Sequence, residues 1–455
     1  MPGPSAAAAS PCANPPTRRW QTGKKTARWK PFSGAGSPFP NNRNFSLFTP
    51  VDATFLIIGA GPAGLLAALS AAQRHPARGV LVLDRMPAPG AKLAVSGGGR
   101  GNLSHLSTEE EFAAAFGRHG RFAIPAFRSL TPDALRERLA GIGIPTTVDP
   151  AGRIYPRSQS AAQVRDALFA AATRLGVRFL FNHAVERLQP PGNPDAPWMV
   201  DSFSARSILI AAGGRSAPRL GSDGSGFALA QSIGYDLVLP VPALTSLRTA
   251  EKWPAGHSGL SLSNVEISIE GSRAREATEQ GEILFTHRGI SGPAVLNLSG
   301  RVARRLLQNR EIRVVLNWAG KIPDMQQLRQ DAGARPIYVW LARQVPRAFA
   351  GTLLELAGIP PDLTFSRLSA AQEKELARHL VALPLTITGT GGFDDSMATA
   401  GGVSLKQVDP ATLEGRLTPR LYFAGEILDL DAPTGGWNLH WAFCSGHLAG
   451  SGAAH

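Results

Sequence analysis

The fold is decided by the stretch Thr54-Phe-Leu-Ile-Ile-Gly-Ala-Gly-Pro-Ala-Gly64, an apolar run that ends in three spaced glycines. Such a run is typical of a strand buried on both faces of a sheet. Residues 65–73 read as the helix that follows, and residues 80–83 as a second buried strand. The order strand, glycine turn, helix and strand predicts a dinucleotide-binding β-α-β unit.

Each glycine of the turn has a physical task. Gly59 permits a tight turn, Gly61 lets the backbone approach a pyrophosphate, and Gly64 lets the helix pack closely on the strand. The helix start offers free N–H groups and a partial positive charge to the phosphates. Asp84 ends the second strand, where it can accept hydrogen bonds from a ribose 2′-hydroxyl and so favours an unphosphorylated ribose. FAD and NAD share this fingerprint.

Later segments favour FAD. The loop Ser96-Gly-Gly-Gly-Arg-Gly-Asn102 is too rich in glycine to be helical, so its backbone can lie against a flat ligand. Gly425-Glu426 ends a short strand and can place a carboxylate on a ribityl chain. Thr434-Gly-Gly-Trp-Asn438 opens a final helix, whose N-terminus can face the negative edge of a reduced flavin.

The candidate site residues come from these segments and their neighbours. The expected cofactor-binding residues are Gly59, Gly61, Pro62, Ala63, Gly64, Asp84, Arg85, Lys92, Ser96, Gly98, Arg100, Asn102, Ala212, Gly213, Gly425, Glu426, Gly435, Gly436 and Asn438. Two histidines are candidate catalytic residues, because imidazole exchanges a proton near neutral pH. His287 lies in a turn at a strand end, and His440 lies on the final helix; a purely structural role is the alternative for both.

Much of the positive charge lies at the N-terminus. The chain of 455 residues has 47 Lys plus Arg against 34 Asp plus Glu, a net charge of +13. Residues 1–50 hold seven of these basic residues and no acid, so we expect a disordered basic tail. The tail is open to three interpretations: a dispensable extension or misplaced start with Val51 as the true start, an organelle transit peptide, or a nucleic-acid arm.

Several classes of protein are excluded. Cys12 and Cys444 are the two cysteines, so neither a disulfide framework nor a Cys-x-x-Cys redox pair exists. No metal-binding pattern and no nucleophile elbow occurs. The longest apolar stretch, residues 53–72, is interrupted by glycines and Pro62, so we expect no membrane span and a cytoplasmic protein.

The order of patterns predicts an α/β protein with an inserted domain. The expected plan is a disordered tail at 1–50, a discontinuous FAD-binding doubly wound domain at 51–236 and 385–455, an inserted β-rich domain at 237–300 and 381–388, and a helical subdomain at 301–380. Among the helices, one is expected to start with a capping box formed by Ser107 and Glu110, and another with one formed by Ser369 and Gln372.

The chain resembles the YhiN-like (BaiN-like) NAD(P)/FAD-dependent oxidoreductases, a family that includes members labelled aminoacetone oxidase. The matching motifs occupy residues 59–64, 92–102, 152–156, 284–293, 400–403, 423–429 and 434–438. The resemblance implies a glutathione-reductase-type FAD domain with an inserted barrel-like domain and helical subdomain. Gly101 stands where the family usually has a cysteine, and Trp437 where it has a tyrosine.

Three functions are compatible with these observations. The first is an FAD-dependent oxidoreductase that acts on an unidentified small molecule, with NAD(P)H as a possible transient reductant, since no second complete glycine fingerprint follows a strand. The second is a flavin-dependent reductase that forms dihydrouridine in ribosomal RNA, because family members have been linked to that reaction. The third is a non-enzymatic FAD-binding protein. The sequence does not determine the oligomeric state.

Overall fold

The computed structural model describes residues 52–75, 79–272, 277–332 and 334–453. The predicted basic tail and Val51 lie outside the described residues. Within the described part of the chain, no helix is both long enough and apolar enough to cross a membrane.

A large sheet carries the glycine turn. Its strands are β1 (Ala53–Ile58), β2 (Val80–Leu83), β6 (Arg178–Leu180), β7 (Leu188–Gln189), β8 (Trp198–Val200), β9 (Phe203–Ile210) and β18 (Leu421–Phe423). They are ordered β6-β2-β1-β9-β8-β7, and β18 also pairs with β9. β6, β2, β1, β9 and β18 run parallel, in the order typical of a doubly wound dinucleotide-binding domain. The predicted Rossmann-like class is confirmed.

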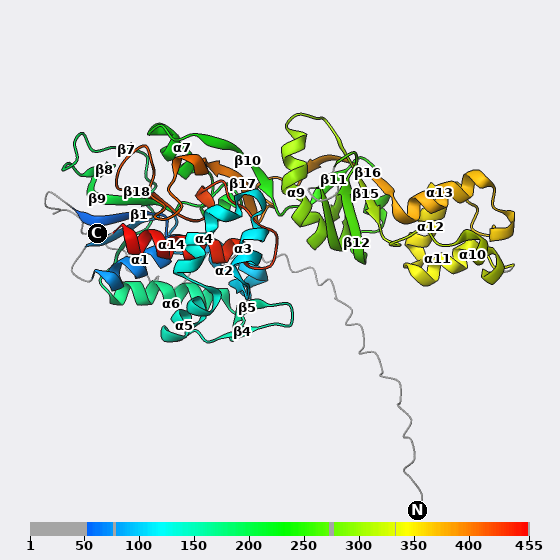
Figure 1. Cartoon of the computed structure of the whole chain (residues 1–455), viewed down its shortest axis with the longest axis horizontal. Helices are drawn as coiled ribbons and strands as arrows, with labels where there is room; N and C mark the ends of the chain where they lie inside the picture. The colour runs from blue at the N-terminus through cyan, green and yellow to red at the C-terminus, as the bar shows by residue number, and fades with distance from the viewer. Residues whose placement is uncertain (1–51, 76–78, 273–276, 333, 454–455) are drawn as a thin grey trace, which may run out of the picture. The chain divides into compact units, whose positions relative to one another are not determined.

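Eight helices accompany this sheet in the described part of the chain. They are α1 (Pro62–Arg74), α2 (Ala91–Ala94), α3 (Glu109–Ala115), α4 (Gly120–Ser129), α5 (Pro132–Gly141), α6 (Ala161–Arg174), α7 (Ser225–Ser232) and α14 (Trp437–Gly452). α1 packs directly on β1 and β2, and it packs against both α14 and α6 (Figure 1). The capping box of α3 is formed by Thr108 and Glu111, so the predicted box at Ser107 and Glu110 was one residue too early.

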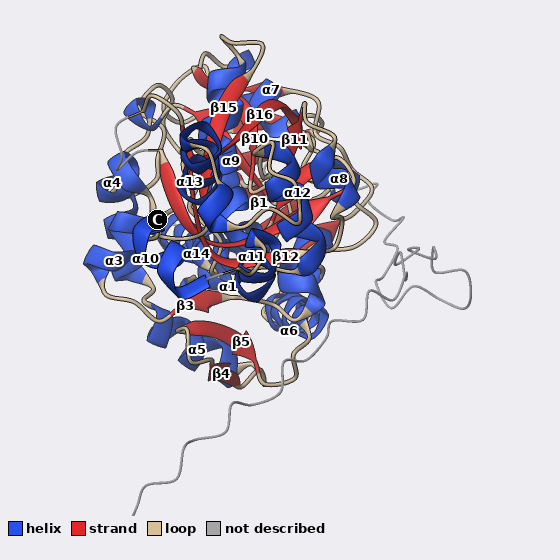
Figure 2. Cartoon of the chain, turned by 90° about the vertical axis from the view of Figure 1, so that its right-hand side faces the viewer, coloured by secondary structure: helices blue, strands red, loops and turns tan. Residues whose placement is uncertain are grey.

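A small antiparallel sheet lies beside α5. It consists of β3 (Ser104–His105), β5 (Arg153–Pro156) and β4 (Thr146–Val148), with β5 in the middle. Figure 2 shows β4 and β5 next to α5.

A closed barrel forms the second β unit. Its strands are β11 (Leu247–Thr249), β14 (Gly289–Ser291), β13 (Thr278–Thr286), β12 (Ser261–Ile269), β15 (Ile312–Asn317) and β16 (Leu383–Thr390), in that order. The accompanying helices are α8 (Trp253–Gly256), α9 (Pro293–Leu306), α10 (Met325–Ala332), α11 (Ile337–Gln344), α12 (Arg347–Leu356) and α13 (Ala370–Val381). α13 begins with the predicted capping box of Ser369 and Gln372.

A two-stranded antiparallel ribbon joins β10 (Leu237–Ala243) to β17 (Ala398–Val403). Two sequence expectations differ from the structure. β10 pairs with β17 instead of joining the barrel, although it falls in the segment predicted for the inserted domain. β15 is a strand inside residues 301–380, which were expected to be helical. β16, which overlaps the predicted β-rich segment 381–388, pairs with β11 and β15 in the barrel. An apolar pattern reveals a strand but not its partner.

The contact between α1 and α14 is unusually close. A Cβ added to Gly446 would lie 2.2 Å from the carbonyl oxygen of Ala63, and one added to Gly450 would lie 2.3 Å from that of Ala67. Both distances are well inside van der Waals contact, so the two glycines let the backbones of the helices touch.

We expect Gly446→Ala to destabilise the protein by about 1–3 kcal/mol because of overpacking, despite the ~1 kcal/mol by which Ala favours a helix over Gly. Gly351→Ala is the matched control, since a Cβ at Gly351 within α12 meets no atom within 4 Å. Thermal unfolding should show a lower Tm for the first variant and an unchanged or higher Tm for the second. A Tm rise in both variants would contradict the close contact.

Candidate cofactor site

The glycine turn after β1 has the geometry that the sequence predicts. Gly59 has a φ of +106°, and a Cβ on it would lie 2.5 Å from the carbonyl oxygen of Ala211. A Cβ on Gly64 would lie 1.8 Å from the carbonyl oxygen of Gly59. A Cβ on Gly61 would meet no protein atom within 4 Å. Two glycines therefore permit close packing, and the third leaves room in front of the α1 N-terminus.

Asp84 lies at the end of β2, beside this turn. Its Oδ2 accepts a hydrogen bond from the Ala60 N–H at 2.5 Å, and its Oδ1 accepts one from the Met86 N–H at 2.7 Å. Burial raises the pKa of Asp84 above its ordinary value, against the effect of these two hydrogen bonds. A carboxylate has about four acceptor positions, so both oxygens keep capacity for a ligand hydroxyl.

A cavity of about 560 Å³ extends from Asp84 to the start of α14. Its wall contains every predicted cofactor-binding residue except Gly64 and Arg100. Gly64 is used in packing, as described above. Arg100 instead lies over the ring of Tyr155, with its guanidinium carbon 5.3 Å from the ring centre.

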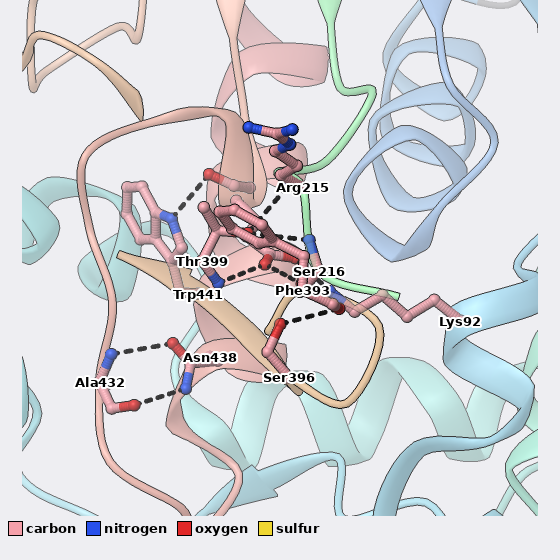
Figure 3. A network of polar contacts seen from close by, with 11 residues as sticks. Lys92, Arg215, Ser216, Phe393, Ser396, Thr399, Ala432, Asn438 and Trp441 are labelled. Carbon is pink, nitrogen blue, oxygen red and sulfur yellow. Dashed lines mark hydrogen bonds and ion pairs between the residues drawn. The ribbon is translucent and has the colours of Figure 1, made fainter. Parts of the chain in front are cut away.

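Glu426 is the centre of a polar network in this wall. Its partners Lys92, Ser216 and Thr399 are labelled in Figure 3. Its Oε2 lies 2.5 Å from Lys92 Nζ, in an ion pair. Its Oε1 accepts hydrogen bonds from Ser216 Oγ at 2.5 Å and from the Thr399 N–H at 2.7 Å. Lys92 also donates to Ser216 Oγ. The network joins four segments that are distant in sequence, and it matches the positive charge of Lys92 with a carboxylate.

Gly425, next to Glu426, is fixed to α14. Its φ is +78°, in the region that favours glycine. Its N–H donates to Ser445 Oγ at 2.9 Å. Its carbonyl oxygen accepts from Trp441 Nε1 at 3.1 Å, and Figure 3 shows this bond at the Trp441 side chain. Both backbone polar groups of Gly425 are therefore satisfied by one helix.

Two predicted cofactor-binding asparagines hold the loop before α14. Asn438 accepts from the Ala432 N–H at 2.9 Å and donates to the Ala432 carbonyl oxygen at 2.7 Å (Figure 3). The amide of Asn102, oriented to satisfy both groups, accepts from the Gly436 N–H at 3.3 Å and donates to the Ser104 carbonyl oxygen at 3.1 Å. Both side chains line the cavity while their amides shape its backbone.

The two candidate catalytic histidines lie away from the cavity wall. His287 is exposed in the turn between β13 and β14. His440 is 1% exposed, and its Nδ1 lies 3.0 Å from Ser104 Oγ. Burial lowers the pKa of His440 to about 3, so the imidazole is neutral near pH 7. His440 is therefore a core residue, which corresponds to the structural alternative stated above.

Sequence reasoning missed the wall next to Asp84. The missed residues are His183, Ala184, Val185, Gly221, Ser222 and Ser225. The first three follow β6 without any motif. The glycine-flanked Gly221-Ser-Asp-Gly224 before α7 was a usable signal, because it places a polar loop at a helix N-terminus.

The hydroxyls of Ser96 and Ser222 test whether the cavity fits a dinucleotide. Both line the cavity, are buried, and form no hydrogen bond with the described part of the chain. Buried polar groups almost always have a partner, so these hydroxyls fit a ligand with phosphate, ribose or ring oxygens. The described residues contain no group of three or more His, Cys, Asp or Glu that could hold a metal ion.

A doubly wound sheet, a glycine fingerprint and this cavity define a Rossmann-type dinucleotide-binding protein. The chain belongs to the family described as HI0933-like protein Rossmann domain, whose model matches residues 53–452.

Its relatives include reductases. The chain is 32% identical, over 88% of its length and 98% of the relative's, to a 3-dehydro-bile acid delta(4,6)-reductase of Clostridium scindens. It is 28% identical to a ribosomal RNA dihydrouridine synthase of Escherichia coli, over 86% of this chain and 95% of the relative. Among solved structures, the chain aligns with 3-ketosteroid delta1-dehydrogenase from Sterolibacterium denitrificans in complex with 1,4-androstadiene-3,17-dione. The TM-score is 0.49 and the identity 14%, and the alignment covers 88% of this chain and 99% of the dehydrogenase. The family match and the relative with 32% identity together identify the chain as an FAD-dependent oxidoreductase.

We expect Gly61→Ala to weaken FAD binding by about tenfold or more, since a cost of ~1.4 kcal/mol at the pyrophosphate is one decade of affinity. The apoprotein should keep its Tm, because a Cβ at Gly61 meets no protein atom within 4 Å. Quenching of flavin fluorescence measures the affinity. Gly141→Ala, outside the cavity wall and equally open, is the control and should bind FAD normally. Unchanged FAD affinity in Gly61→Ala would show that the pyrophosphate lies elsewhere.

We expect His440 to make the fold sensitive to acid. Its folded pKa of about 3 is below the unfolded value of ~6.5, so the unfolded state binds more protons between those pH values. Stability should therefore fall by up to ~1.4 kcal/mol per pH unit as pH drops below 6.5. Urea unfolding at pH 7.5 and 5 should show a smaller pH effect in His440→Leu than in wild type. An equal pH effect would place His440 in solvent.

Proposed function

We propose that this chain is an FAD-dependent reductase that takes a hydride from NAD(P)H and delivers it to a carbon–carbon double bond conjugated to a carbonyl group in a small molecule. The observation that most strongly supports FAD as the cofactor in this proposal is the continuous cavity from Asp84 to the start of α14. An adenosine-binding acid at one end and a helix N-terminus at the other match the two ends of FAD.

Different parts of the wall serve different parts of the cofactor in this proposal. Asp84 holds the adenosine ribose, and Gly61 with the α1 N-terminus holds the pyrophosphate. Glu426 orients the ribityl chain, while the Thr434-Gly-Gly turn and the α14 N-terminus face the flavin ring. When bound, FAD supplies the hydride transfer; the positive end of α14 favours the negative charge of the reduced ring.

NAD(P)H is proposed as a transient reductant. One complete Gly-x-Gly-x-x-Gly follows a strand, and its turn belongs to the cavity assigned to FAD. A nicotinamide dinucleotide without its own fingerprint therefore binds briefly, gives up its hydride and leaves before the substrate is reduced.

The substrate class rests on the two named relatives. A delta(4,6)-reductase and a dihydrouridine synthase both saturate a carbon–carbon double bond that is conjugated to a carbonyl group. Such a bond is activated for hydride addition, because the carbonyl group takes up the negative charge that develops, and a proton from water then completes the saturated product. The small-molecule substrate is preferred, since the relative with the higher identity has one.

The test is anaerobic reduction and reoxidation of the purified holoprotein. NADPH or NADH should bleach the flavin absorbance, and a cyclic enone such as a 3-keto-4-ene steroid should then restore it. The corresponding saturated ketone, which lacks the double bond, is the matched control. Failure of both nicotinamides to reduce the flavin would overturn the proposed reductant. Reoxidation by unmodified ribosomal RNA with dihydrouridine formation, but by no enone, would overturn the small-molecule substrate.

A further inference from the structure

Helix α9 extends from the barrel to the outside of the cofactor cavity wall. It begins at Pro293, directly after barrel strand β14, and packs against β10 and β13. Gly300 makes this approach close, because a Cβ on it would lie 3.2 Å from the Cβ of Ala243 in β10. α9 therefore contacts the ribbon that borders the cavity as well as the barrel itself.

Asn297, three residues before Gly300 on α9, contacts the cavity wall directly. Its Oδ1 accepts a hydrogen bond from the Thr434 N–H at 2.9 Å and a second from the Thr434 hydroxyl at 3.1 Å. Thr434 lines the cavity. One amide oxygen thus satisfies both the backbone and the side-chain donor of a wall residue.

Thr434 begins a turn that is intrinsically adaptable. Gly435 has a φ of +130° and Gly436 a φ of +104°, and glycine pairs have more accessible conformations than other residues. Asn438 holds the loop at Ala432, before the turn, and Asn102 holds it at Gly436, the last residue of the turn. Asn297 holds its first residue, and it is the partner that comes from the barrel side.

We propose that Asn297 is a positioning residue for FAD: helix α9 uses it to fix the Thr434-Gly-Gly turn, and thereby the N-terminus of α14, against the flavin ring. This inference rests on the proposed function. The field of a helix end acts only within its first turn, so a turn that moves stabilises the reduced flavin less. The barrel then takes part in cofactor tuning without touching the cofactor.

Three substitutions test the role of Asn297. Asn297→Leu removes the acceptor, Asn297→Asp keeps an acceptor oxygen for both donors, and Thr434→Val removes the hydroxyl donor alone. Asn309→Leu is the matched control, because Asn309 follows α9, lies outside the cavity wall, and its side chain donates to the Arg305 carbonyl oxygen. FAD affinity is measured by fluorescence quenching, and the reduction potential by equilibration with a reference dye.

We expect Asn297→Leu to bind FAD about tenfold more weakly and to have a lower reduction potential, since a tenfold loss of preference for the reduced form is about 30 mV for two electrons. Asn297→Asp should be close to wild type, Thr434→Val intermediate, and Asn309→Leu unchanged. Wild-type affinity and potential in Asn297→Leu, or equal defects in the Leu and Asp variants, would overturn the inference. If Asn297→Leu does not fold, wild-type values in Thr434→Val would overturn it.

Failure of the inference differs from failure of the proposed function. A wild-type protein that binds no FAD, or whose FAD no nicotinamide reduces, would refute the function whatever the variants do. A wild-type protein that binds FAD and is reduced by NAD(P)H, together with an unaffected Asn297→Leu, would refute only the role of Asn297.

Discussion

The backbone contact between α1 and α14 is the constraint on which the site depends. Gly446 contacts Ala63, and Gly450, four residues later, contacts Ala67, which is also four residues later. The residue numbers rise in the same direction along both helices, so the two helices run parallel. At 1.5 Å per residue, the N-terminus of α14 therefore extends about 12 Å beyond that of α1. Two positive helix ends point the same way with this offset; in the FAD placement that we propose, one faces the pyrophosphate and the other faces the flavin ring. A side chain larger than hydrogen at either glycine would force the helices apart.

The segment between β18 and α14 depends on that contact in turn. Gly425 lies between the helices, since a Cβ on it would be 3.0 Å from the Cβ of Ala63, and α14 satisfies both of its backbone groups. Its neighbour Glu426 can then gather Lys92, Ser216 and Thr399 around one carboxylate. Isolated surface ion pairs contribute little, but this one is partly buried and shares its carboxylate with two further donors. The ion pair and the two hydrogen bonds together fix four segments of the chain relative to one another around the cavity.

Local signals explain what the sequence could predict. The glycine fingerprint, the strand ends and the capping box at Ser369 are encoded within a few residues, so the doubly wound domain and the motif-bearing part of the cavity wall could be predicted from pattern alone. Partnership between distant strands is not encoded in this way: the pattern of β16 shows a strand, but only the structure shows that β11 and β15 flank it. The burial of a polar residue cannot be predicted from local sequence either. The residues around His440 are compatible both with a structural histidine in the core and with a catalytic histidine in a site.

Gly101 and Trp437 replace a cysteine and a tyrosine that are usual in the family that the sequence resembles, so this chain has neither a thiol nor a phenol at these positions. The φ of Gly101 is +79°, and a Cβ there would lie 3.2 Å from Ala161, so the position suits glycine better than any side chain. Among the described residues the free cysteine is Cys444, and burial raises the pKa of its thiol well above the ordinary value. Trp437 stacks on His105 at 4.3 Å between ring centres, and it offers no phenol. Neither a reactive thiolate nor a phenol is therefore present at these positions. The hydride transfer that we propose uses neither group; it needs the flavin ring held beside the acceptor carbon, and in our proposal the turn at Thr434 and the paired helices hold the ring.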